Sequence, residues 1–169
     1  MNFTFKPVSI GVTLSILALL AGILHGMAFG ANEDGLKDMF KKNAQAAFAG
    51  KPEEINEAAG GAWKSLKRAH MHFMGLGAMA LALCLFAGLS PAGNGLKMGA
   101  SIAVGFGAVV YPLHFTIGAF KASHLGKHAA HEAVEFVAIP GAGATLLGIV
   151  AMLVICIGWA LKKEESAGA

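Results

Sequence analysis

Residues 136–161 read FVAIPGAGATLLGIVAMLVICIGWAL, a run of 26 residues without a single Asp, Glu, Lys or Arg. A transmembrane helix needs about 20 mainly apolar residues to cross a hydrocarbon core of about 30 Å. Three further runs of 23 to 26 residues also lack these four residue types, and they cover 7–32, 71–96 and 98–120. None of the runs alternates apolar and polar residues as a barrel strand does. The chain is therefore expected to form four transmembrane helices.

The overall composition supports this interpretation. Of the 169 residues, 56% are hydrophobic and 14% are charged, whereas an ordinary soluble domain has about 25% charged residues. A net charge of +3 is too small to predict nucleic-acid binding, and the apolar content excludes an intrinsically disordered chain. Cys84 and Cys156 lie inside apolar runs, so no disulfide framework is expected. No Cys-x-x-Cys-His sequence is present, which excludes covalently attached c-type haem.

The first apolar run has two interpretations, a cleaved signal peptide or a retained helix. The stretch after Lys6 is longer than the apolar region of about 7–15 residues in a signal peptide. Gly22, Gly26 and Gly30 recur every four residues, a spacing that lets membrane helices pack closely. We therefore predict a retained helix.

These features predict an all-α membrane protein, an antiparallel four-transmembrane-helix bundle in a single domain over residues 1–169. The predicted transmembrane helices cover about 8–30, 62–89, 96–121 and 127–162, with a polar connection at 31–61.

Within the polar connection, Leu36, Phe40 and Ala44 recur on one helical face. This pattern predicts an amphipathic surface helix between the first two transmembrane helices, lying along the membrane interface. Gly60 and Gly61 are expected to break the chain before the second transmembrane helix begins.

The histidines are the most informative polar residues. In an up-down bundle, the end of the first helix, the start of the second, the end of the third and the start of the fourth meet on one side of the membrane. All the histidines belong to those four regions: His25, His70, His72, His114, His124, His128 and His131. A histidine at an interface can simply bond water or a backbone carbonyl, but polar groups inside a membrane are costly and indicate function by default.

Helical spacing indicates which histidines share a face. His128, His131 and Glu135 recur at three- and four-residue intervals, which predicts one stripe on the fourth helix. His70 and His72 are two residues apart, so one is expected to face the bundle centre and the other a different neighbour.

Three hypotheses about function follow from this cluster. In the first, the protein is a b-type haem redox protein that exchanges electrons with quinol or a redox-protein partner near one membrane face. The candidate haem-binding residues are His25, His72, His114, His128 and His131. In the second, the site binds copper, zinc or iron. The candidate metal ligands are His70, His72, His128, His131, Glu132 and Glu135.

The third hypothesis is a small structural subunit of a larger membrane complex, because no large extramembrane domain is expected. The sequence shows no phosphate-binding loop, nucleophile elbow or paired catalytic carboxylates, so no enzyme class is predicted.

The basic residues give conflicting signals about orientation. Nine of the 13 Lys and Arg residues lie on the histidine side, and the positive-inside rule would place that side in the cytoplasm. Lys6, which precedes the first apolar run, instead favours a cytoplasmic N-terminus. We expect an integral protein of a bacterial inner membrane with its histidine-rich side facing out.

Overall fold

The computed structural model describes residues 3–167, with side chains described for residues 3–161. The described chain is helical throughout, apart from short connections: η1 Lys6–Val8, α1 Ser9–Ala47, α2 Pro52–Leu89, α3 Asn94–Leu125, α4 Lys127–Glu132 and α5 Glu135–Ala167. Four of these helices, α1, α2, α3 and α5, contain stretches long and apolar enough to cross a membrane. The prediction of an all-α bundle of four long apolar helices is confirmed.

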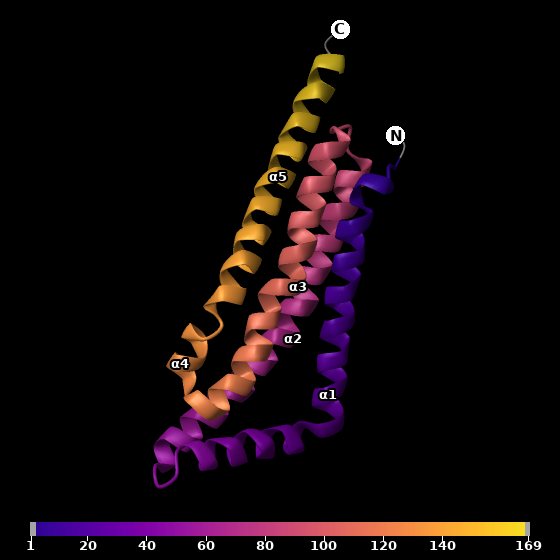
Figure 1. Cartoon of the computed structure of the whole chain (residues 1–169). Coiled ribbons are helices and arrows are strands. Elements are labelled where there is room, and N and C mark those ends of the chain that lie inside the picture. Colours follow the sequence, from indigo (N-terminus) through magenta and orange to yellow (C-terminus); the bar gives the residue numbers. More distant parts are fainter. Residues whose placement is uncertain (1–2, 168–169) are drawn as a thin grey trace.

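The long helices run up and down, and both chain ends lie at the same end of the bundle (Figure 1). Helices α1, α2 and α3 all pack against one another, whereas α5 packs on α3 and touches α2 only slightly. Most large apolar side chains of α5 remain exposed, among them Leu146 at 64% and Leu147 at 69%. Lipid contact is the simplest use of such a surface.

Glycines set the distances between neighbouring helices. A Cβ added to Gly105 of α3 would lie 2.8 Å from the Gly11 carbonyl oxygen of α1. A Cβ added to Gly107, also in α3, would lie 2.9 Å from the carbonyl oxygen of Gly141 in α5. Both distances are too short for a real side chain, so the backbones meet where side chains are absent.

The connection between the first two membrane helices differs from its predicted form. No separate helix is present there, because residues 33–47 are the last part of α1. Asn32 has non-helical torsions, φ −152° and ψ 42°, and the helix turns sideways at this point to run beneath the bundle (Figure 1). The apolar face of this part packs on the protein: Phe40 and Ala44 are both 0% exposed.

Phe40 belongs to a second, smaller core at this end of the bundle. Its buried members come from four helices: Phe40, Ala62, Leu66, Ala119, Ala122 and Ala130. The larger core lies along the bundle, around Phe73 and Val104. The smaller core therefore holds the sideways part of α1 against α2, α3 and α4.

The second helix begins earlier than predicted. It starts at Pro52, near the first-turn position that suits proline, with Glu53 and Glu54 favourably placed at the positive end of the helix dipole. The expected break at Gly60 and Gly61 is wrong, because both glycines lie inside α2. Neighbouring helices stabilise the backbone there despite its low intrinsic helix propensity.

The predicted helix over 127–162 is interrupted in the structure. It is divided into α4 and α5, with Ala133 and the buried Val134 between them. Gly126 separates α3 from α4 with φ 79°, a backbone conformation that glycine adopts without strain.

Candidate functional site

The histidines lie at the end of the bundle where α1 bends and α4 begins, and they form two groups between the long helices. The first group lies between α1 and α2 and contains His25 and His70. The Nδ1–H of His70 donates to the Gly22 carbonyl oxygen at 2.8 Å. Both imidazoles pack on Phe29, with ring centroids 6.4 Å from His25 and 5.6 Å from His70. Two histidines from different helices therefore share one aromatic neighbour.

His25 uses both of its ring nitrogens. Its Nδ1–H donates to the Ala21 carbonyl oxygen at 2.8 Å, and its Nε2 accepts from the Thr116 hydroxyl at 3.2 Å. The second bond links α1 to α3. Both ring nitrogens of His25 therefore already have hydrogen-bond partners within the protein.

The second group lies between α2 and α3 and contains His72 and His114. Both imidazoles pack on Phe115, with ring centroids 4.8 Å from His72 and 3.8 Å from His114. Tyr111 is a second shared neighbour, 5.6 Å and 4.8 Å from the same two rings. His114 is 4% exposed, and it lines the same cavity as His131. His70 and His72 therefore point to α1 and α3 respectively; their spacing predicts this divergence, although neither ring is buried at the bundle centre.

The four histidines of these groups share one hydrogen-bonding pattern. Each donates its Nδ1–H to a backbone carbonyl: His25 to Ala21, His70 to Gly22, His72 to Arg68 and His114 to Tyr111. A ring that donates through Nδ1 presents the lone pair of Nε2 when it is neutral. Among residues 3–161, no hydrogen-bond partner reaches Nε2 of His70, His72 or His114.

Most predicted residues of the fourth helix lie apart from these groups, whereas His131 borders the same cavity as His114. His128, Glu132 and His124, which lies in the last turn of α3, are exposed. His131 and Glu135 come within 4.0 Å, with side chains 68% and 53% exposed. Across the described part of the chain, no three His, Cys, Asp or Glu side chains are placed to hold one metal ion. The six predicted metal ligands are thus not gathered at one point.

His128 borders a separate small cavity of ≈ 300 Å³ between α4 and the beginning of α2. The predicted haem-binding residues therefore divide into three places. His25 lies between α1 and α2, His72 and His114 lie together with His131 nearby, and His128 borders the smaller cavity.

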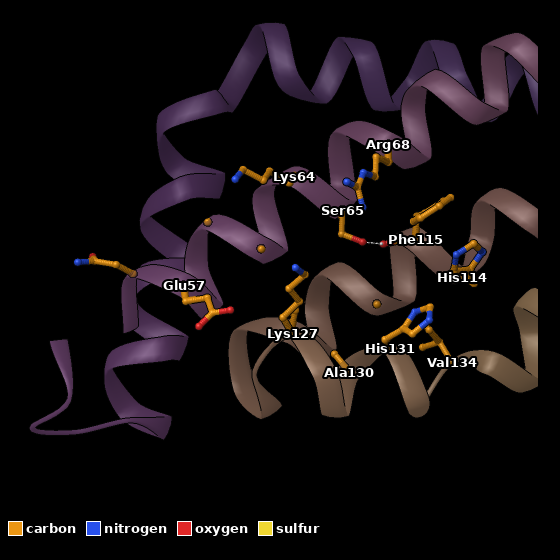
Figure 2. A pocket seen from close by; sticks show the side chains of 15 residues that line it. Glu57, Lys64, Ser65, Arg68, His114, Phe115, Lys127, Ala130, His131 and Val134 are labelled. Carbon is orange, nitrogen blue, oxygen red and sulfur yellow. Dashed lines mark hydrogen bonds between the residues drawn. The ribbon is translucent and has the colours of Figure 1, made fainter. Parts of the chain in front are cut away.

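A larger cavity of ≈ 390 Å³ lies between α2, α3 and α4 (Figure 2). His114 and His131 border one end of it, and Lys127 extends into it from α4. The remaining lining comes mainly from α2 and α3: Asn56, Glu57, Gly60, Gly61, Lys64, Ser65, Arg68, Phe115, Gly118, Ala122, Ala130 and Val134.

Sequence reasoning missed the cationic lining of this cavity. Lys64 and Arg68 are four residues apart, a spacing that places them on one helical face. The predicted break at Gly60 and Gly61 placed the start of the second helix at about residue 62. Lys64 and Arg68 therefore lay in its first turns, where no shared helical face was predicted. Ser65 completes this face and donates to the Phe115 carbonyl oxygen at 2.9 Å.

Comparison with protein-family models, with curated proteins and with solved structures finds no match to this chain. A function can therefore be inferred only from the side chains and cavities described above.

Proposed function

We propose that the protein is a membrane-bound b-type haem redox protein. Histidines near one membrane face would ligate the haem, which would exchange electrons with quinol or with a redox-protein partner on that side. The observation that supports this proposal is the shared orientation of the four interhelical histidines. Metal-ligating histidines almost always donate the ring N–H that faces away from the metal to a carbonyl, a carboxylate or water. That arrangement fixes the tautomer and leaves the other nitrogen for iron.

His72 and His114 are the residues that would hold the haem iron. They come from two neighbouring helices, α2 and α3. Both keep Nε2 without a hydrogen-bond partner among the described residues. Tyr111 and Phe115 provide the aromatic surroundings. Bound haem would supply a one-electron carrier whose potential depends on its ligands and on burial.

His25 and His70 are the second candidate pair. They also come from neighbouring helices, and they share Phe29 as a neighbour. The bond from Thr116 to Nε2 of His25 would have to break before that nitrogen could bind iron, and this cost favours His72 and His114.

Absorption spectroscopy of the protein purified from native membranes tests the proposal. We expect a Soret band that sharpens on reduction with dithionite. His72→Ala and His114→Ala should each reduce haem content several-fold, because each would remove one residue that holds the iron. His124→Ala is the matched control, since His124 is exposed and belongs to neither interhelical group.

The outcomes distinguish the candidate pairs. Loss of the Soret band in His25→Ala and His70→Ala, but not in His72→Ala, would transfer the site to the other pair. A protein without any Soret band would overturn the haem proposal.

A copper, zinc or iron site is a second candidate. It is favoured by His131 and Glu135, which approach within 4.0 Å and could serve as two ligands of an exposed site. Elemental analysis of the same sample tests it, because stoichiometric metal without a Soret band would identify this function. A structural role in a larger complex is the third candidate, favoured by α5, which packs on α3 and is otherwise largely uncovered.

The proposed location is a bacterial inner membrane, with the histidine-rich side facing out. In this arrangement the part of α1 after Asn32 is an amphipathic segment at the membrane interface. This position is supported by the different exposure of the two faces of the segment. Phe40 and Ala44 are buried on the bundle, whereas Lys37, Lys41 and Lys42 are exposed. Lysines at this level can reach water or lipid headgroups.

A further inference from the structure

We infer that the cavity between α2, α3 and α4 binds a phosphate group, carried either by an anionic membrane lipid or by a small soluble phosphate. The cavity adjoins the proposed haem ligands, because His114 and Phe115 border one end of it, but the test of phosphate binding involves no haem.

The charges of the cavity wall favour an anion. Lys64 and Arg68 contribute two cations from α2, and Lys127 contributes a third from α4. Glu57 is the one carboxylate in the lining. Three cations against one carboxylate make the wall positive even when the neighbouring imidazoles are neutral, so the cavity would concentrate anions.

These cations are not neutralised by the protein. Among residues 3–161, no carboxylate oxygen lies within 4.0 Å of Lys64, Arg68 or Lys127. The ion pairs in this range involve Lys37, Lys51 and His131 instead. All three side chains of the cavity wall are exposed, so water solvates their charges in the free protein. A bound anion would replace part of that water with charge-assisted hydrogen bonds.

The shape of the cavity gives room for a ligand with both a polar and an apolar part. Gly60 and Gly61 have no side chain to fill it, and a Cβ at Gly60 would meet nothing within 4 Å. Phe115 and Val134 line the same space with apolar surface. A phosphate with an attached hydrocarbon chain suits such a mixed lining, since its charge and its chain both find partners.

The cavity also lies at the depth where lipid phosphates occur. Lys64 and Arg68 stand just before the apolar run that begins at Met71, and the apolar run of α3 ends at Phe120. Cations at the ends of hydrocarbon-spanning segments meet the headgroup layer. Arginine and lysine are the residues that bind phosphate most effectively, arginine through two parallel hydrogen bonds.

Native mass spectrometry in a phosphate-free detergent solution tests the inference, with phosphatidylglycerol and phosphatidylcholine as probes. Inorganic phosphate is the third probe, and its binding is measured by the thermal unfolding midpoint of the protein. We expect phosphatidylglycerol to bind more tightly than phosphatidylcholine if the ligand is an anionic lipid. We expect inorganic phosphate alone to raise the midpoint if the ligand is a small soluble phosphate.

Variants locate the binding. Arg68→Gln and Lys127→Gln should each weaken binding about tenfold or more, because each removes charge-assisted hydrogen bonds to the phosphate. Lys67→Gln is the matched control: Lys67 neighbours Arg68 in sequence, but its Nζ lies over the Trp63 ring, 5.7 Å from the centroid. Its substitution should leave binding within about twofold, because it lies outside the cavity lining.

A cavity-filling variant separates this site from general surface attraction. A Cβ at Gly118 would lie 3.6 Å from Val134 Cγ2 and 3.7 Å from Ser65 Oγ, so Gly118→Leu would place its longer side chain in the cavity without changing charge. We expect it to abolish binding, and circular dichroism with size-exclusion chromatography would verify that each variant folds. Equal losses in Lys67→Gln and Arg68→Gln, unchanged binding in folded Gly118→Leu, or no binding of phosphatidylglycerol or of inorganic phosphate would overturn the inference.

Discussion

At the scale of single residues, the interhelical histidines act as hydrogen-bond donors between or within helices. His70 is the clearest case, because its Nδ1–H crosses from α2 to the Gly22 carbonyl oxygen of α1 at 2.8 Å. Its ring also occupies the space beside Gly26, where an added Cβ would lie 3.0 Å from Cε1. The small residue on α1 and the ring on α2 therefore fit one another whether or not a cofactor binds.

The first prediction concerns this hydrogen bond. His70→Phe keeps an aromatic ring beside Gly26 but removes the donor to Gly22. We expect a loss of about 1 kcal/mol in the free energy of unfolding, the usual contribution of one intramolecular hydrogen bond. Denaturant titration in detergent measures it, with the exposed residue His124 changed to Phe as the control. Equal stability of both variants would show that the bond contributes nothing.

Sequence reasoning about residues succeeded where helical periodicity alone decides the outcome. The divergence of His70 and His72 followed from their two-residue separation, and the structure confirms it by placing them against α1 and α3. It failed at Lys64 and Arg68, because the side chains that complete their cavity come from α3 and α4. Periodicity within one segment carries no information about how distant segments meet.

At the scale of elements, α5 differs from the other long helices in having one main neighbour. It meets α3 at a close glycine contact, where a Cβ at Gly107 would lie 2.8 Å from the Thr145 backbone nitrogen. Gly148 of α5 provides a second contact, with an added Cβ 2.7 Å from the Val104 backbone nitrogen. Membrane helices associate through such close packing because lipid gives no hydrophobic drive between them.

The second prediction follows from this contact. Gly107→Ala should force α3 and α5 apart and destabilise the protein by about 1–3 kcal/mol, the usual cost of overpacking. Gly143→Ala in α5 is the matched control, because a Cβ there would meet nothing within 4 Å. Thermal unfolding in detergent compares the two variants. A midpoint that falls equally in both would argue against a specific glycine contact.

The third prediction concerns the sideways part of α1. Phe40 is 0% exposed in the smaller core and packs on Phe120 with ring centroids 5.7 Å apart. Phe40→Ala should cost about 3–5 kcal/mol, the usual loss for a buried aromatic ring, and should release residues 33–47 from the bundle. Limited proteolysis would detect faster cleavage in this segment. Met27→Ala, at a side chain that is 64% exposed, is the control and should leave the cleavage rate unchanged.

The course of α1 also shows where element prediction reached its limit. The amphipathic repeat of Leu36, Phe40 and Ala44 correctly identified a helical face. It could not show that the face packs on the protein, or that the helix continues from α1 with one irregular residue at Asn32. Both outcomes depend on tertiary contacts with α2 and α3, and such contacts override local signals.

At the scale of the whole molecule, the histidines and the cationic cavity gather at one end of the bundle. Both histidine groups, the cationic cavity and the smaller core lie at the end where α1 bends, whereas the chain ends and the turn between α2 and α3 lie at the other (Figure 1). The four apolar runs predicted this division. An even number of membrane spans returns the chain to the side where it started, and the two inter-helix connections nearest the histidines then meet on the other side. The division makes the two ends of the molecule experimentally distinguishable.

The last prediction tests this arrangement in the membrane. Lys51 lies in the connection between α1 and α2, and Gly93 lies in the turn between α2 and α3; both are exposed. Single cysteines at these positions should react with a membrane-impermeant maleimide from opposite sides, because α2 would cross the bilayer between them. Cys156 is exposed and Cys84 is buried, so Cys156→Ser provides the background. In intact cells, Lys51→Cys should be labelled and Gly93→Cys protected until the membrane is permeabilised, given the proposed outward-facing histidine side. The reverse labelling would retain the bundle but invert its orientation, as the distribution of basic residues would favour. Labelling of both positions in intact cells would contradict a membrane-spanning α2.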